Sequence, residues 1–263
     1  GSSGKKVNWV HLDYKKQNFS SNHMPLMKKM LELIDVNVAV SKVAAQSYQE
    51  VFDLKEDVKV IHNIIQSDLI KEKFAQSVNS DDLRLFKNKD LTFISVGRLV
   101  EQKGYDRLIK IHRRLIDEGF KHNIMIIGNG EDEQTLKNEI KKNNCQETFK
   151  LIGYRENPFA YFKLADCFLL PSRYEGLPTV VFESLICQIP VIATKVAGIE
   201  EQLKDSSYGL VVNNDESDFY EAMKTIIMHP EKLEKMKDKL KDYHYQNETI
   251  ITQISNLVEG DLC

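Results

Sequence analysis

Cysteine is scarce in this sequence, and its four cysteines do not form pairs. None lies in a C-x-x-C motif, and none has a histidine at metal-ligand spacing. This arrangement excludes the disulfide framework of a small secreted domain and the common zinc-binding motifs. We expect free thiols in a reducing compartment at Cys145, Cys167, Cys187 and Cys263.

Long apolar runs and a strong net charge are also missing. No run approaches the roughly 18 apolar residues of a membrane span, and the first residues lack a signal-peptide pattern. We therefore expect the protein to act in the cytoplasm. The formal net charge is −3, so no bulk positive field attracts nucleic acid, which we do not expect as a partner.

Only the segment from residue 5 to 30 is markedly basic. It holds six lysines and a single acid, Asp13, close to Trp9 and Phe19. Such a patch fits peripheral contact with an anionic membrane at its inner face, but a solvated basic face is the simpler interpretation. The lysines are Lys5, Lys6, Lys15, Lys16, Lys28 and Lys29.

Short β-branched runs alternate with amphipathic stretches along most of the chain, which is typical of βαβ units. The predicted strands are residues 91–96, 123–127, 149–152, 167–170, 190–193 and 209–212. We therefore predict an α/β fold with a Rossmann-like, doubly wound parallel sheet. The same alternation before residue 70 predicts a partial second Rossmann-like unit.

The composition divides the chain into five segments. Residues 1–4 look like an expression scar or linker, and the polar stretch 76–90 separates two folded units. The segments are therefore 1–4, a first unit at 5–75, a linker at 76–90, a second unit at 91–230, and C-terminal helices at 231–263 that we expect to pack back toward the first unit.

A loop rich in glycine and cations follows the first strand of the second unit. Gly97 stands at the strand end, and Arg98 and Lys103 follow before Gly104. Ligands of doubly wound sheets bind at this edge, where two cations could clamp a diphosphate. A turn with solvated cations is the alternative. The turn Gly128-Asn129-Gly130 lacks the third glycine of a dinucleotide fingerprint, although its backbone could approach a ligand closely.

The segment from Pro171 to Leu185 is the most informative part of the sequence. Pro178 suits the start of a helix at residues 179–188, whose free amides make an anion site. Glu183 falls inside an apolar stretch of that helix, where a carboxylate needs a partner. A buried ion pair is one possible partner, and a ligand hydroxyl is the other.

These motifs together resemble the glycosyl transferases group 1, retaining enzymes with the GT-B fold. The resemblance rests on the 97–104 loop, the 128–131 turn, Gly153-Tyr154, and Glu175 and Glu183 at E-x7-E spacing. It implies that residues 91–230 bind the donor and that 5–75 is the end of an N-terminal acceptor-side domain.

The resemblance also assigns roles to individual residues. Glu175 and His11 would be catalytic, with Glu175 beside the donor sugar and His11 at the interdomain cleft. Glu183 would bind ribose. The other donor-binding positions would be Gly97, Arg98, Lys103, Gly130, Tyr154, Gly176, Leu177, Pro178 and Thr179. The family's proline-asparagine-glycine turn appears here as Ile61-His62-Asn63-Ile64, which keeps only the asparagine.

By resemblance, the reaction moves a sugar from a nucleoside-diphosphate sugar, with a UDP-sugar favoured, to a hydroxyl of a sugar, lipid-linked or protein acceptor. No cofactor and no metal is expected, since cations and the helix end can stabilise the leaving diphosphate. A long segment normally precedes the first strand, so this chain alone could bind donor without turnover. The alternatives are a non-catalytic half of a two-chain transferase and a GT-B-like phosphorylase or epimerase.

Overall fold

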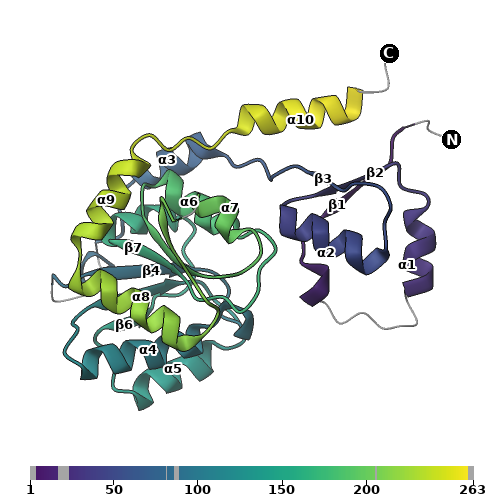
Figure 1. Cartoon of the computed structure of the whole chain (residues 1–263). Helices are drawn as coiled ribbons and strands as arrows, with labels where there is room; N and C mark the ends of the chain where they lie inside the picture. Colours follow the sequence, from purple (N-terminus) through teal and green to yellow (C-terminus); the bar gives the residue numbers. More distant parts are fainter. Residues whose placement is uncertain (1–3, 17–23, 81, 86–88, 205, 260–263) are drawn as a thin grey trace.

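The computed structural model describes residues 4–16, 24–80, 82–85, 89–204 and 206–259. These residues form a large and a small part, each built on a parallel sheet (Figure 1). Several sequence predictions include residues outside these ranges: residues 1–3 of the proposed scar, Phe19 of the basic patch, residues 81 and 86–88 of the predicted linker, and residues 260–263, with Cys263.

The large part contains the predicted doubly wound sheet. Its strands lie in the order β6-β5-β4-β7-β8-β9, and every neighbouring pair is parallel. The chain thus starts at the centre and reverses its direction of winding between β4 and β7. The strands are β4 (Thr92–Val96), β5 (Asn123–Ile127), β6 (Phe149–Leu151), β7 (Cys167–Leu170), β8 (Val191–Thr194) and β9 (Gly209–Val212).

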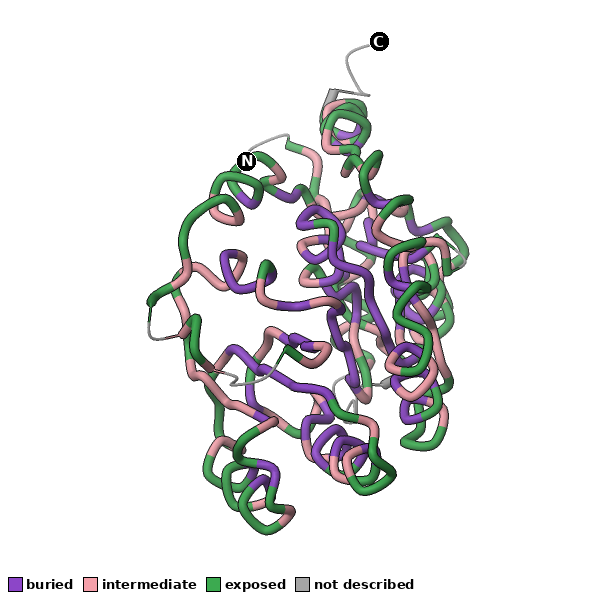
Figure 2. Tube along the Cα trace, turned by 90° about the vertical axis from the view of Figure 1, so that its left-hand side faces the viewer, coloured by how far each residue is buried: buried purple, intermediate pink, exposed green. Residues whose placement is uncertain are grey.

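Helices cover both faces of this sheet, which explains why its strands are continuous apolar runs. One core cluster lies beneath α4, α5, α8 and α9, and another beneath α3, η4, α6 and α7. In Figure 2 the strands are mostly buried and the outer turns of the helices exposed. The elements are α3 (Ser67–Ala75), η2 (Asp82–Arg84), η3 (Glu101–Lys103), α4 (Tyr105–Asp117), α5 (Glu133–Lys142), η4 (Phe159–Leu164), α6 (Thr179–Ile186), α7 (Ile199–Leu203), α8 (Glu216–Met228) and α9 (Glu231–Leu240).

The small part is a three-stranded parallel sheet in the order β1-β2-β3. Its strands and helices are β1 (Val7–Val10), η1 (Tyr14–Lys16), α1 (Met24–Leu31), β2 (Val36–Ala39), α2 (Lys42–Phe52) and β3 (Lys59–Val60). One face packs against α1 and α2. The other packs against α10 (Asn247–Glu259), the last helix, which extends from the large part toward the small sheet (Figure 1).

The chain crosses from the small part to the large part earlier in the sequence than predicted. Ile61 packs with the small sheet, whereas Ile65 and Ile70 belong to the core of the large one. Helix α3 therefore packs against the large part, although it falls within the predicted first unit 5–75, and the polar stretch 76–90 is not the boundary. Composition marks a polar stretch, but the apolar face of α3 carries no sign of which sheet it covers.

The basic patch near the start also differs from the membrane interpretation. Trp9 is partly buried and packs against the cluster that contains α10, so its ring is not displayed beside the lysines. Lys15 forms an ion pair with Glu50. Neither residue therefore supports an exposed membrane-binding patch at this place.

Candidate functional site

The candidate site lies at the carboxyl ends of the central strands of the large sheet. The loops after β4, β5, β6 and β7 meet there, at the point where the winding direction reverses. Each of these strands is followed by one of the predicted loops, which contain Gly97, Gly130, Tyr154 and Glu175 in that order.

The glycines after β4 and β5 pack against one another. A Cβ on Gly128 would lie 1.9 Å from Gly97 O, and one on Gly130 would lie 2.3 Å from Leu99 O. The Leu99 amide also donates to Asn129 O at 2.8 Å. Close contact between the two loops therefore already requires glycine at Gly130, whether or not a ligand approaches it.

A cavity of about 260 Å³ opens between the ends of β4, β5 and β6. Its lining includes the predicted residues Arg98 and Tyr154, and Tyr154 is 67% exposed. Within the described part of the chain, the Arg98 side chain has no hydrogen-bond or ion-pair partner. The full lining is Val96, Gly97, Arg98, Ile127, Gly128, Asn129, Tyr154, Arg155 and Pro158.

One wall of this cavity is held by Arg155 together with Asp82 and Tyr161, two residues that the sequence analysis did not predict. Arg155 Nε donates to Asp82 Oδ2 at 3.0 Å and to Tyr161 Oη at 2.9 Å, and Tyr161 Oη donates to Asp82 Oδ2 at 2.6 Å. Asp82 lies in the stretch predicted to be a linker. No local signal marks it, because its partners are more than 70 residues away along the chain.

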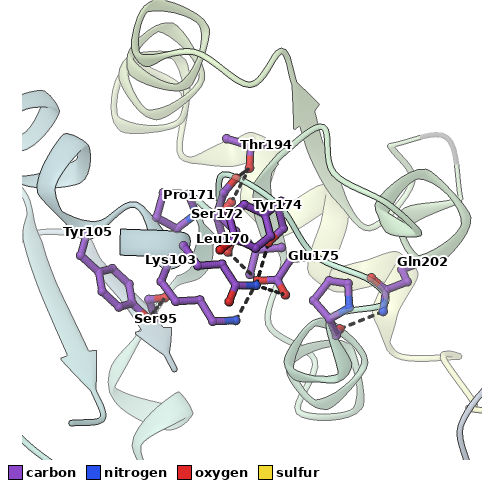
Figure 3. A network of polar contacts seen from close by, with 12 residues as sticks. Ser95, Lys103, Tyr105, Leu170, Pro171, Ser172, Tyr174, Glu175, Thr194 and Gln202 are labelled. Carbon is purple, nitrogen blue, oxygen red and sulfur yellow. Dashed lines mark hydrogen bonds and ion pairs between the residues drawn. The ribbon is translucent and has the colours of Figure 1, made fainter. Parts of the chain in front are cut away.

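Glu175 is enclosed by a network of polar contacts (Figure 3). Its Oε1 accepts hydrogen bonds from Lys103 Nζ and from Ser172 Oγ, both at 2.7 Å. Its side chain is only 9% exposed, and that of Lys103 16%. Thr194 Oγ1 in turn donates to Ser172 O at 2.6 Å. The structure thus pairs Lys103 with Glu175, while Arg98 lines the cavity.

The loop after Glu175 leads directly into α6. Pro178 is the N-cap residue, and Thr179 is exposed at the first position of the helix. Leu177 is buried in the core, so only its backbone faces the site. Gln202 Nε2 donates to Pro178 O at 2.9 Å, while Gln202 Oε1 is buried without a partner among the described residues.

The two predicted catalytic residues lie on neighbouring segments from different parts of the chain. A Cβ on Gly176 would lie only 2.0 Å from His11 O, so the end of β1 touches the loop that carries Glu175. Ser41, which caps α2 through the Ala44 amide at 3.1 Å, also donates to Gly176 O at 3.4 Å. The His11 side chain is exposed beside this junction.

Glu183 sits in the middle of α6 and is half-buried. Burial raises the pKa of its carboxyl above the ordinary value. Among the described residues, the Glu183 side chain has no hydrogen-bond or ion-pair partner. No described residue therefore forms the buried ion pair that the sequence analysis gave as one alternative. The carboxylate therefore has unused acceptor capacity.

No three histidine, cysteine or acidic side chains of the described residues lie close enough together to hold a metal ion. Among the same residues, no helix is both long and apolar enough to cross a membrane. The thiols of Cys145, Cys167 and Cys187 are free, as predicted, and all three are buried.

Comparison with known proteins identifies the family of this chain. The family described as glycosyl transferases group 1 matches residues 79–243, more than half of the chain and all the loops described above. The chain belongs to this family. Membership supports the interpretation of the protein as an enzyme and matches the prediction from its motifs.

Several relatives of this chain are named as glycosyltransferases. An uncharacterized glycosyltransferase of Methanocaldococcus jannaschii is 32% identical over 63% of this chain and 40% of its own length. The Campylobacter jejuni N-acetylgalactosamine-N,N'-diacetylbacillosaminyl-diphospho-undecaprenol 4-alpha-N-acetylgalactosaminyltransferase is 28% identical over 81% of this chain and 57% of its own length. This chain therefore spans about half the length of such relatives.

Solved structures share the fold. Anabaena HepE in complex with UDP has a TM-score of 0.82 at 17% identity, covering 97% of this chain and 72% of HepE. Staphylococcus aureus TarM in complex with UDP has a TM-score of 0.77 at 18% identity, covering 97% and 50%. These likenesses identify the fold as that of GT-B glycosyltransferases, as expected.

Proposed function

We propose that the large part of this chain binds a UDP-sugar, and that the protein transfers the sugar to an acceptor hydroxyl with retention of anomeric configuration. The donor would lie along the carboxyl edge of the sheet, from the cavity beside Tyr154 to the loop that carries Glu175. The relatives named above carry the names of glycosyltransferases, and both structural neighbours hold UDP.

The observation that carries this proposal is the unpartnered carboxylate of Glu183. Burying a carboxylate without donors costs several kcal/mol, so the position suits a ligand that brings donors of its own. The two hydroxyls of a ribose match the two oxygens of the carboxylate. The raised pKa of Glu183 reports this missing solvation.

The remaining groups fit the other parts of such a donor. The cavity beside Arg98 and Tyr154 would receive the base, with its wall held by Arg155. The free amides at the start of α6 would meet the diphosphate.

Charge on the leaving diphosphate would be stabilised by the protein's own cations and amides, without a metal ion or other cofactor. Lys103 would exchange its contact with Glu175 for a phosphate oxygen. Glu175 would then position the sugar and stabilise its cationic transition state, with His11 on the opposite side of the cleft.

The acceptor is proposed to be a sugar, with a lipid-linked sugar favoured because the Campylobacter relative is named for one. A peripheral membrane contact would involve α1, where Lys28 and Lys29 lie beside the exposed Leu26 and Met30. Sedimentation with vesicles containing anionic lipid tests this contact. Binding that survives Lys28→Glu with Lys29→Glu would argue against α1 as the contact.

Calorimetry with UDP tests the donor site in this chain alone. Glu183→Gln should weaken UDP binding at least tenfold, since hydrogen bonds to a charged group contribute about 1.5–3 kcal/mol each. The matched control is Glu221→Gln, which changes an exposed glutamate of α8. Equal affinity for UDP in the Glu183 variant and the wild type would refute the role of this carboxylate.

Thermal-shift measurements test the choice of nucleotide. Stabilisation should be larger with UDP than with GDP or ADP at equal concentration, because a ligand stabilises the folded state according to its affinity. Greater stabilisation by GDP would leave the donor class intact but reject uridine.

The role of Glu175 is tested by comparing UDP with a UDP-sugar. In Glu175→Gln the affinity for UDP should stay close to the wild-type value, while the affinity added by the sugar and the rate of transfer should fall. A variant that transfers sugar at the wild-type rate would contradict the assignment.

A further inference from the structure

Two segments far apart in the sequence are joined by a series of hydrogen bonds next to Glu175. They are the turn and first residues of α4 at 101–107, which carry Lys103, and the loop at 171–175, which carries Glu175. The Arg173 amide donates to Gln102 O at 2.8 Å, and Gln102 Nε2 donates to Tyr174 O at 2.9 Å.

An ion pair lies at the outer side of this meeting. Arg173 Nη1 and Nη2 donate to the two carboxylate oxygens of Asp106, both at 2.8 Å. The hydrogen bonds from Arg173 hold the pKa of Asp106 below its ordinary value. Arg173 Nη1 also donates to Glu101 O at 2.6 Å, so one guanidinium is fixed to both the turn and the helix.

A buried arginine lies at the inner side. Arg107 is 7% exposed, and its Nε donates to Pro171 O at 3.0 Å. Its Nη2 donates to Asn214 Oδ1 at 2.8 Å, and Asn214 Nδ2 donates to Arg173 O at 2.8 Å. Two carbonyls of the loop are therefore held by side chains from α4 and from the segment before α8.

The backbone leaves little freedom at the same place. Gly104 has φ +69°, and a Cβ there would lie 2.2 Å from Pro171 O. The carbonyl of Pro171 therefore rests directly against the start of α4. We call the three supporting side chains, Asp106, Arg107 and Asn214, the clasp.

We propose that the clasp is a positioning device, which sets the loop so that Glu175 stands at hydrogen-bonding distance from Lys103 before any donor arrives. This inference rests on the proposed donor site, because it concerns the group that would meet the sugar. None of the three clasp side chains contacts Glu175 itself within the described residues. They act through the backbone on either side of Arg173.

Preorganisation of this kind has a measurable consequence. A donor that meets a loop already in place does not have to order it, and therefore binds more tightly. If the clasp loosens, the loss should appear in the contacts of the sugar with Glu175. Contacts of the nucleotide with Glu183, on a different element, should be spared.

Hydrogen exchange of the chain without ligand tests the mechanical half of the proposal. Asp106→Asn should speed exchange of the Arg173 amide at least tenfold, while the urea midpoint of the chain stays near that of the wild type. Asp117→Asn is the matched control, because Asp117 pairs with Arg113 on the same helix through the same two-point geometry but away from the loop. An Arg173 amide that stays protected in Asp106→Asn would overturn the proposal.

Calorimetry tests the functional half. In Asp106→Asn and, independently, in Asn214→Ala, the ratio of UDP-sugar to UDP affinity should fall at least threefold, with UDP affinity kept. Exchanging the charges, with Asp106→Arg and Arg173→Asp together, should recover part of the ratio. Faster exchange with an unchanged ratio would reduce the clasp to a structural support.

The two tests separate this inference from the proposed function. If the wild-type chain binds no UDP, the proposed donor site fails, while hydrogen exchange still decides whether the clasp holds the loop. If UDP binds and the clasp variants leave the ratio of UDP-sugar to UDP affinity unchanged, only the positioning role fails.

Discussion

A buried pair of histidines should make the large part sensitive to mild acid. His112 and His122 are both fully buried, and His112 Nδ1 lies 2.8 Å from His122 Nε2. His122 Nδ1 is 2.8 Å from Phe120 O, which can only accept, so this nitrogen carries the proton. His112 Nδ1 must then donate to His122, and His112 Nε2 accepts from Thr148 Oγ1 at 2.9 Å.

This arrangement requires both rings to be neutral. Burial is the main cause that lowers the pKa of His112 to about 2 and that of His122 to about 4. A group with a lowered pKa in the folded state contributes stability above its unfolded pKa, near 6.5, and loses it as the pH falls. At pH 5 the unfolded chain gains a proton on each imidazole, whereas the buried rings stay neutral. Each ring therefore lowers the free energy of unfolding by about 2 kcal/mol, because pH 5 lies about 1.5 units below the unfolded pKa and each unit corresponds to about 1.36 kcal/mol. The pair should therefore cost about 4 kcal/mol between pH 8 and pH 5.

Urea denaturation at the two pH values measures this loss. A double variant, His112→Leu with His122→Leu, leaves Thr148 and Phe120 without partners at both pH values, so its cost does not depend on pH. It should lose about 4 kcal/mol less than the wild type on going from pH 8 to pH 5. His229→Gln is the control, because His229 is exposed near Glu231. Equal losses in the wild type and the double variant, or ring signals that titrate near pH 6.5, would refute the reasoning.

Three further substitutions test other parts of the structure. Gly176→Ala should lower stability by about 1–3 kcal/mol in urea denaturation, because the new methyl would meet His11 O and force the two parts to separate. Leu257→Ala on α10 should cost about 2–4 kcal/mol, whereas its exposed neighbour changed as Val258→Ala should cost little. Glu183→Gln should stabilise the unliganded chain at pH 7, because the raised pKa of Glu183 makes its charged form unfavourable, and the gain should vanish at pH 4, where the carboxyl is protonated.

Some features of the site were accessible from local patterns. The apolar runs predicted the strands of the large sheet to within a residue or two, because strands covered on both faces must be continuously apolar. Pro178 marked the start of α6, and the apolar neighbours of Glu183 marked a desolvated carboxylate. Each of these properties is set by residues adjacent in the chain.

Other features depended on which strands lie side by side. The pairing of Lys103 with Glu175 and the contact of Arg155 with Asp82 join residues more than 70 positions apart. The assignment of α3 to the large sheet likewise depends on which face is left open by the other helices. An amphipathic pattern indicates that a face is buried but not against what.

The sequence by itself determined the fold class, the family and the loops that form the candidate site, because these follow from local apolar patterns and motif spacing. Only the tertiary structure decided that Glu175 is held by Lys103 and Ser172, that Asp106 and Arg107 support its loop, and that Glu183 is left without a protein partner. The physical reason is the order of the sheet. It brings β4 next to β7, and with them two loops whose contacts no local pattern in either segment encodes.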